Sequence, residues 1–450
     1  MSGEARPWLG RRIHLIGVGG AGMSAYARAA HALGASVTGS DGADGPYLRR
    51  LAADGVLQAR VGHSAENVPA GQDVEVFHSS AIAPENVERA AARERGLPDR
   101  PRADLLGELS ALRRTIAVAG THGKTTTAAM IAHILRAAGM RPSWLVGAPI
   151  GGGLPNAGWD QGEWLVIEAD ESDRSLLSLT VEVAVLLNVE LDHHASFASL
   201  AELREVFGSF LAAPPTAVVW DRPELLALRG GETVAFDQPE PVLGPEGSVF
   251  TWRGEQVRLS VPGAHNALDA TAALEATRLA GAPLAKAIEA LREFTGAGRR
   301  FQLDGVSAGG AQVYEDYAHH PTEIEATLRA ARTLGQQRLV AVFQPHLFSR
   351  TQLLAREFGR ALALADAVIV LDVYPARERA QDFPGISGLT IAETTADAAG
   401  GRPVYWLPAM SAAEHVLAGM LRAGDVCMVM GAGDVDALAH ALAGTREGAE

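Results

Sequence analysis

Lysine is almost absent from this chain of 450 residues: Lys124 and Lys286 are the only two, and every other basic residue is arginine. Cysteine occurs once, as Cys427 within an apolar run. A single cysteine excludes a disulfide framework and a cysteine metal cluster. We expect Cys427 to be a buried structural thiol in a protein of a reducing compartment.

Long apolar runs are missing as well. No uninterrupted apolar stretch approaches the roughly 20 residues that span a bilayer, and the first 20 residues show no signal-peptide pattern. The formal net charge of −14 at pH 7 argues against broad nucleic-acid binding. These shortages predict a soluble cytoplasmic protein with no nucleic-acid or membrane partner, in which local donors hold any anionic substrate.

Residues 115–127 combine a strand, a glycine loop and the start of a helix. Residues 116–119 fit a buried parallel strand, and residues 128–139 have helical spacing. A helix N-terminus favours an anion, and glycines let phosphate oxygens approach the backbone. Gly120 and Gly123 are closer together than the usual phosphate-loop pattern requires, so an ordinary glycine turn remains an alternative.

The lysine that follows this loop favours nucleoside triphosphate binding. In a chain this poor in lysine, Lys124 supplies the compact positive charge that phosphate loops use. Thr125 adds a hydroxyl group that can bind Mg²⁺. We therefore predict that residues 120–126 bind ATP, with Mg²⁺ as the accompanying metal.

A buried strand at residues 164–167 ends in four carboxylates, Glu168, Asp170, Glu171 and Asp173. Such crowding of negative charge favours a cation. We expect Glu168 to complete the Mg²⁺ shell, because this ion is typically held by one or two carboxylates and substrate phosphates. A solvated acidic turn is the alternative.

A second buried strand is predicted at residues 183–189, and Asp192, His193 and His194 follow it. Polar residues at the end of a parallel strand lie where such sheets bind ligands. They are interpreted as a second metal or phosphate contact, and a polar surface is the alternative.

Residues 12–41 are typical of a βαβ unit that opens with a glycine turn. Gly17, Gly19 and Gly22 fit the dinucleotide fingerprint, and Asp41 falls near the position of its ribose-binding acid. Three interpretations stay open at this point: a dehydrogenase, a non-redox nucleotide diphosphate site and a structural turn.

The alternation of strands and helices predicts an α/β protein of three domains. We expect a Rossmann-like domain at residues 1–108, a central mononucleotide-binding domain of the P-loop ATPase type at 109–296, and a Rossmann-like doubly wound domain at 297–450. The last domain is predicted to contain an open parallel sheet. Its strands are expected at residues 312–315, 339–343, 367–373, 404–407 and 426–430.

Taken together, the motifs resemble those of the Mur ligases of bacterial peptidoglycan synthesis, and most of all the members that add L-alanine to UDP-N-acetylmuramate. The resemblance covers nearly the whole chain. It is carried by residues 17–23, 79–82, 119–127, 168–173, 192–193, 265–266, 298–301, 316–323 and 343–346.

The resemblance implies an ATP-dependent ligase. ATP would phosphorylate the lactyl carboxylate of UDP-N-acetylmuramate, and the amino group of L-alanine would then displace phosphate. The glycine turn of the first domain would hold a non-redox diphosphate.

The resemblance also implies roles for individual residues. Those expected to bind ATP are Gly120, Thr121, His122, Gly123, Lys124, Thr125, Thr126, Asn266 and Arg300. Those expected to bind the UDP-sugar are Gly19, Gly20, Ala21, Gly22, Asp41, Ser79 and Ser80. The metal ligands would be Thr125, Glu168 and His193, and the amino acid would face Tyr317, His319, His346 and Arg350. The catalytic set would be Lys124, His193, Arg300 and Asp316, of which Arg300 and Asp316 help to form a closed state.

Three departures from the family pattern bear on this site. Asp269 stands where a second asparagine is expected, and Leu347 replaces the first of two arginines, which leaves Arg350 to hold the amino-acid carboxylate. Several relatives carry a carbamylated lysine in the central domain, but this chain has no lysine between Lys124 and Lys286. We therefore expect catalysis without a carbamate.

Two other functions stay open: a different amino-acid or peptide ligase of the same family, and a nicotinamide-dependent oxidoreductase built on residues 17–41. We expect a monomer or a weak homodimer.

Overall fold

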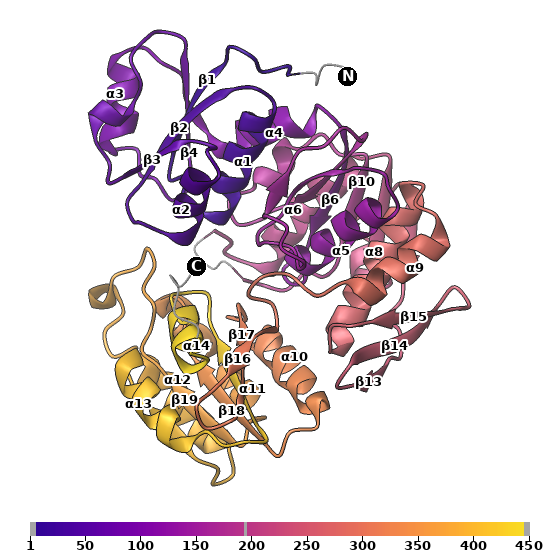
Figure 1. Ribbon diagram of the computed structural model, residues 1–450, viewed down its shortest axis with the longest axis vertical. Helices are drawn as coiled ribbons and strands as arrows, with labels where there is room; N and C mark the ends of the chain where they lie inside the picture. The colour runs from indigo at the N-terminus through magenta and orange to yellow at the C-terminus, as the bar shows by residue number, and fades with distance from the viewer. Residues whose placement is uncertain (1–5, 193–195, 445–450) are drawn as a thin grey trace. The chain divides into compact units, whose positions relative to one another are not determined.

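The computed structural model describes residues 6–192 and 196–444 of the chain (Figure 1). The chain forms two compact units. The first contains residues up to 238 together with 269–290, and the second contains residues 239–268 and those from 291 onward. The first unit contains two mostly parallel sheets, and the second contains one large, mostly parallel sheet and one small antiparallel sheet. Among the described residues, no helix has the length and apolar character needed to cross a membrane.

The first sheet of the first unit is parallel throughout, in the order β3-β2-β1-β4-β5. Apolar side chains alternate along its strands, so Leu15 packs with α1, α2 and α4 while Ile16 packs with α3. The elements are β1 (Arg12–Ile16), α1 (Ala21–Ala32), β2 (Ser36–Asp41), α2 (Pro46–Ala53), β3 (Gln58–Val61), β4 (Val74–His78), α3 (Val87–Glu94), β5 (Asp99–Pro101) and α4 (Arg102–Ser110).

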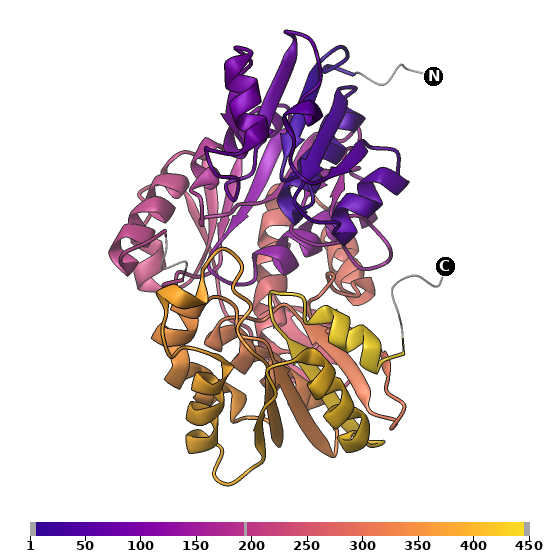
Figure 2. The same cartoon turned by 90° about the vertical axis from the view of Figure 1, so that its left-hand side faces the viewer.

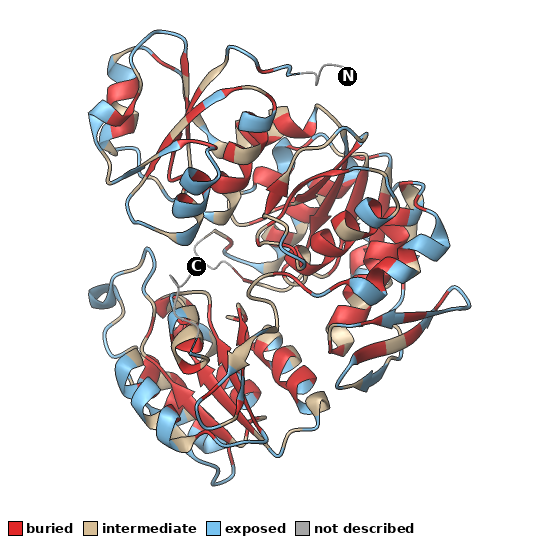
Figure 3. Ribbon diagram, in the orientation of Figure 1, coloured by how far each residue is buried: buried red, intermediate tan, exposed pale blue. Residues whose placement is uncertain are grey.

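The second sheet of this unit has the order β12-β11-β10-β6-β9-β7-β8, and only β7 and β8 pair antiparallel. Its central strands are buried on both faces (Figure 3). Helix α6 packs on one face, and Ser199 begins it by accepting a hydrogen bond from Glu202 N. The elements are β6 (Arg114–Ala119), α5 (Lys124–Ala137), β7 (Ser143–Leu145), β8 (Ala157–Gly158), β9 (Trp164–Glu168), β10 (Val183–Leu186), α6 (Leu200–Ala212), β11 (Thr216–Trp220), α7 (Pro223–Leu226) and β12 (Thr233–Phe236).

Two helices run across the boundary between the units, α8 (Ala264–Leu279) and α9 (Leu284–Glu293). The second unit begins with a small antiparallel sheet of three strands, whose order is β13-β14-β15. These strands are β13 (Val242–Gly244), β14 (Gly247–Trp252) and β15 (Glu255–Leu259).

The large sheet of the second unit has the order β16-β17-β21-β18-β19-β20. Helices α10, α11 and α12 pack on one face and α13 and α14 on the other (Figure 2). Helix α10 begins with a capping box at His320 and with Pro321 in its first turn. The elements are β16 (Gln302–Val306), β17 (Gln312–Asp316), α10 (Pro321–Ala331), β18 (Arg338–Phe343), α11 (Phe348–Leu362), β19 (Ala367–Val370), α12 (Gly388–Ala398), β20 (Val404–Trp406), α13 (Met410–Met420), β21 (Asp425–Met430) and α14 (Asp436–Leu442).

The predicted α/β fold class is confirmed, with two details that differ. The last sheet is not wholly parallel, because β16 pairs antiparallel with β17 at its edge. The strand expected at residues 183–189 ends at Leu186, where the chain turns toward the loop after β6. Cys427 is fully buried in β21, as expected, and burial raises the pKa of its thiol to about 12.

Candidate active site

The backbone N–H groups that can receive an anion lie at the start of α5, because those of Thr121 and His122 in the loop before it donate to Asn188. Gly120 and Gly123 have φ angles of +135° and +84°, a backbone conformation that residues other than glycine rarely adopt. Gly123 precedes α5 without a side-chain cap, and the first turn of α5 contains no acidic residue. The unpaired N–H groups and the helix dipole therefore favour a phosphate at this point, and Thr126 lies in the same turn.

Lys124 is folded back over this loop. Its Nζ donates to Gly120 O at 2.6 Å and Thr121 O at 3.1 Å, and it lies 3.0 Å from Glu171 Oε2. Burial alone would lower the pKa of Lys124, but the charges of Glu171 and its neighbours outweigh burial and raise it. The lysine is thus charged and is paired with Glu171, a fully buried carboxylate to which the sequence reasoning assigned no individual role.

Thr125 and Glu168 meet as expected for a metal site. Thr125 Oγ1 lies 3.0 Å from both carboxylate oxygens of Glu168, and Gly147 N donates to Glu168 Oε2 at 2.6 Å. A Cβ on Gly147 would lie 2.5 Å from that oxygen, so a larger residue there would displace the Glu168 carboxylate. A hydroxyl and a carboxylate brought together beside a phosphate loop fit the hard oxygen ligands that Mg²⁺ prefers.

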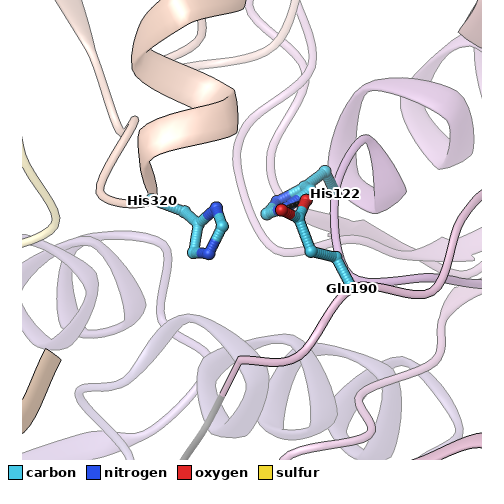
Figure 4. A group of neighbouring side chains, drawn as sticks. All are labelled: His122, Glu190 and His320. Carbon is cyan, nitrogen blue, oxygen red and sulfur yellow. Dashed lines mark hydrogen bonds and ion pairs between the residues drawn. The ribbon is translucent and has the colours of Figure 1, made fainter. Parts of the chain in front are cut away.

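The segment after β10 forms the other wall of the loop. Asn188 Oδ1 accepts from His122 N at 2.8 Å, and Asn188 Nδ2 donates to His122 O at 3.0 Å. Thr121 Oγ1 donates to Glu190 O at 2.8 Å, and the side chains of His122 and Glu190 meet at 3.0 Å (Figure 4).

The sequence reasoning assigned no role to Asn188 or Glu190, although their position directly after a buried parallel strand was a usable signal. His193, predicted as a metal ligand and catalytic residue, lies outside the described residues.

The glycine turn after β1 is held tightly by β2. Gly17 N donates to Ser40 O at 2.9 Å, and Gly19 N donates to Asp41 Oδ2 at 2.9 Å. A Cβ on Gly17 would lie 3.0 Å from Cβ of Ser79, which places the Ser79–Ser80 turn beside the glycine turn. Asp41 therefore fixes the shape of the turn in this structure.

The other residues predicted for the UDP-sugar lie around the start of α1. Gly20 precedes α1 without a side-chain cap, and Ala21 and Gly22 form its first residues. Asn156, from the segment before β8, donates to Ala21 O at 2.8 Å and is almost fully buried. Ser80 is exposed. The first turn of α1 thus contacts the segment before β8, which belongs to the second sheet of this unit.

The buried carboxylate of Glu88 supports the glycine turn after β1 indirectly, through Ser40. Glu88 is fully buried, and it accepts hydrogen bonds from Ser40 Oγ at 2.7 Å and Asn67 Nδ2 at 3.0 Å. Burial would raise its pKa, but hydrogen bonds from His14, Asn67 and other donors lower it to about 2. Because Ser40 O receives the N–H of Gly17, this anion positions the turn, and the sequence gave no local signal for that role.

In the second unit, Asp316 ties together two of the predicted motifs. Its carboxylate accepts from Phe301 N at 2.8 Å and from Ala318 N at 2.7 Å. Burial raises its pKa to about 6, although the nearby Arg300 opposes this shift. Arg300 lies 5.2 Å from the ring centre of Tyr317, so the predicted pair of Arg300 and Asp316 does occupy one neighbourhood.

The residues predicted to face the amino acid also gather in the second unit. The ring centres of Tyr317 and His319 are 5.5 Å apart, and those of His319 and His346 are 6.0 Å apart. Arg350 Nη1 donates to His346 O at 3.3 Å, and Arg350 is only 3% exposed. A guanidinium and two imidazoles thus stand together at the ends of β17 and β18.

Leu347, the residue that replaces a family arginine, is held in a strained conformation. Its φ and ψ are +73° and 134°, and its side chain is 8% exposed. Its N–H donates to Tyr374 O at 3.0 Å. This leucine packs under the loop, so the structure gives it a packing role at the start of α11.

Two residues of α8 were singled out for nucleotide binding. Asn266 is 5% exposed and its Nδ2 donates to Pro262 O at 2.6 Å, which ties it to the turn before the helix. Asp269 lies against the phosphate loop, because its Oδ1 would be 2.5 Å from a Cβ on Gly123. A side chain at position 123 would therefore displace this carboxylate, in addition to the strain imposed by the positive φ.

Models of one protein family match three consecutive segments of the chain. They are described as the catalytic domain of the Mur ligase family at residues 12–114, the Mur ligase middle domain at 118–277, and the Mur ligase glutamate ligase domain at 299–433.

Individual relatives agree with these matches. The chain is 41% identical to a UDP-N-acetylmuramate–L-alanine ligase of Mycolicibacterium smegmatis, over 97% of this chain and 95% of the relative. It is 42% identical to the enzyme of the same name from Rubrobacter xylanophilus, over 94% and 97%. The crystal structure of a UDP-N-acetylmuramate–alanine ligase from Thermotoga maritima matches with a TM-score of 0.83 and 27% identity, over 96% of this chain and 98% of that one.

Proposed function

Because the chain belongs to the Mur ligase family, we propose that it joins L-alanine to the lactyl carboxylate of UDP-N-acetylmuramate at the expense of ATP. The observation that carries this proposal is the phosphate loop with Lys124 and the Thr125–Glu168 pair, in a chain similar over nearly its full length to ligases of that name. We assign the UDP-sugar to residues 1–108, ATP to residues 109–296 and the amino acid to residues 297–450.

The first chemical step is phosphoryl transfer. A lactyl carboxylate oxygen attacks the γ-phosphorus of ATP, the bond to the β,γ-bridging oxygen breaks, and ADP leaves. The loop amides and Lys124 hold the phosphates, and Thr125 and Glu168 would hold Mg²⁺, which neutralises phosphate charge when it is bound. Lys124 must then exchange Glu171 for phosphate oxygens as its partner.

The second step is amide formation. The neutral amino group of L-alanine attacks the acyl carbon of the acyl phosphate, inorganic phosphate leaves, and the amine loses a proton. Arg350 and His346 are assigned to the alanine carboxylate, and Arg300 to the phosphate charge that develops. Catalysis then rests mainly on positioning and charge stabilisation.

The test is ADP release measured with each substrate omitted in turn. We expect release only when UDP-N-acetylmuramate and L-alanine are both present, together with a product that contains both. Lys124→Met should abolish it, and Lys286→Met is the matched control because the only other lysine is exposed on α9. Release with a different amino acid or a peptide, and not with L-alanine, would support another Mur-type ligase. Nicotinamide binding without ADP release would support an oxidoreductase.

We also propose a cytoplasmic location and a monomer or weak homodimer. The single cysteine, buried in β21, suits a reducing compartment.

A further inference from the structure

We call the first sheet of the first unit with its helices (β1 to α4) the first module, and the second sheet with its helices (β6 to β12) the second module. Arg102, the first residue of α4, belongs to the first module. Its side chain reaches the acidic turn after β9 in the second module. Its Nε donates to Asp173 Oδ2 at 2.5 Å and its Nη2 donates to Asp170 Oδ2 at 2.8 Å. The side chain is 13% exposed. Arg102 thus fixes the same turn that contains Glu171, the partner of the loop lysine.

The third nitrogen of this guanidinium faces the glycine turn of the first module. Arg102 Nη1 lies 3.1 Å from the place that a Cβ on Gly22 would take. Gly22 is in the first turn of α1, which has neither a side-chain cap nor an acidic residue. Nε and Nη2 donate to carboxylates, whereas Nη1 lies beside the N-terminus of α1, where anions bind.

A second contact joins the same two modules. Tyr47 Oη, on α2, donates to Gly147 O at 3.3 Å, and Gly147 N in turn donates to Glu168 Oε2. Both contacts lie within the first unit. The acidic residues beside the phosphate loop are therefore connected at two points to the module that contains the glycine turn.

We propose that Arg102 binds a phosphate of the nucleotide-sugar through Nη1 while Nε and Nη2 hold Asp173 and Asp170, so that the arrival of this substrate orders the acidic turn beside the ATP loop. The proposal rests on the proposed function, because it takes the UDP group as the ligand of the glycine turn. A planar guanidinium suits this task, since its five N–H groups are fixed in one geometry and contact several anions at once. The coupling is reciprocal, so UDP should tighten binding of MgATP and MgATP should tighten binding of UDP by the same factor.

The test compares the affinities of UDP and uridine by calorimetry in the full-length chain. Arg102→Lys keeps the positive charge but cannot span three partners, and we expect the Kd of UDP to rise about tenfold or more, as for a lost charge-assisted contact. The Kd of uridine, which has no phosphate, should stay unchanged. Arg100→Lys is the matched control: Arg100 also pairs with acids, Asp104 and Glu108, but these lie within the first module.

Asp173→Asn supplies a second measurement in case Arg102→Lys unfolds. This variant retains Arg102 but weakens its hold on the acidic turn, so we expect a near-normal Kd for UDP and a smaller effect of UDP on the Kd of a non-hydrolysable MgATP analogue.

Four outcomes count against the proposal. The Arg102 assignment alone is overturned if wild type binds UDP and Arg102→Lys binds it equally well. It is also overturned if Arg102→Lys loses UDP and uridine to the same extent, or if Asp173→Asn leaves the coupling unchanged. If wild type binds no UDP at all, the proposed function fails and the role of Arg102 fails with it.

Discussion

Replacing Asp269 by asparagine should tighten the binding of ATP. Asp269 is 6% exposed on α8, and its Oδ1 would lie 2.5 Å from a Cβ on Gly123, at the N-terminus of α5. A carboxylate at this point opposes the helix dipole's attraction for phosphate. Asparagine has nearly the same shape, keeps an acceptor oxygen, and replaces the other oxygen by an N–H₂ donor.

The size of the effect follows from the distance. A phosphate bound to the N–H groups beside Gly123 would place a negative charge about 6 Å from this carboxylate, and two unit charges at that separation repel by about 0.7 kcal/mol at a dielectric constant of 80 and about 2.8 kcal/mol at 20. Since 1.4 kcal/mol is tenfold in affinity, the expected gain is roughly three- to hundredfold. The site is buried, so we expect the upper half of this range.

Calorimetric titration with MgATP measures the change directly. Glu275→Gln is the matched control, because Glu275 is also buried on α8 but lies six residues further along, about 9 Å. The control should change the Kd of ATP by no more than about twofold. A clear loss of ATP affinity in Asp269→Asn would refute the electrostatic argument and show that the carboxylate has a role of its own.

Four further predictions concern other parts of the protein. Gly147→Ala places a Cβ 2.5 Å from Glu168 Oε2, so the Mg²⁺ concentration for half-maximal phosphate release should rise about 10–100-fold, and an unchanged titration contradicts the metal assignment. Arg350→Ala should lower kcat/KM for L-alanine more than about tenfold and leave the KM of ATP unchanged; a normal KM and kcat for alanine would remove Arg350 from the amino-acid site. Glu315→Gln should stabilise the protein at pH 8.5 but little at pH 4. Burial and Asp304 raise the pKa of Glu315 to about 8, so the folded state keeps a proton that the unfolded state releases above about pH 4.5. The free energy of unfolding of the unchanged protein therefore falls as pH rises between these values. Urea titrations at both pH values decide this, and equal shifts at both would show that Glu315 titrates normally. Activity should not depend on bicarbonate, because no lysine lies between α5 and α9 to form a carbamate; rescue of CO₂-depleted enzyme by bicarbonate would overturn this.

The α/β class was predictable from the sequence because buried strands and helices alternate with glycine and proline stops. The early end of β10 was not. The predicted strand ran through Asn188 to Val189, but the side-chain amide and the backbone carbonyl of Asn188 bond the backbone of His122 and Thr121 instead of a neighbouring strand. A pattern of apolar residues gives no information about such an exchange of partners.

The proximity of Glu168 to the glycine loop was predictable, because both lie at the carboxyl ends of buried parallel strands; their roles in binding stay predictions. The partner of Lys124 was not, because Glu168 ends β9 and three more carboxylates follow it, and only the path of the turn decides which one reaches the loop. Arg102 is 68 residues from Asp170, and an arginine at the start of a helix gives no sign in the sequence of such a contact. Leu347 could be recognised in the sequence as a departure from the family pattern, but its burial at the start of α11 is visible only in the structure.

The two lysines of this chain differ in exposure, so the chemical reactivity of Lys124 can be compared with that of Lys286 in the same molecule. Lys286 is exposed on α9, whereas the ammonium group of Lys124 is enclosed by two carbonyls and a carboxylate. An amine-selective reagent followed by peptide mass spectrometry would therefore read two side-chain amines in one digest. The modification of Lys286 normalises the dose of reagent, and the modification of Lys124 follows nucleotide occupancy without any engineered label.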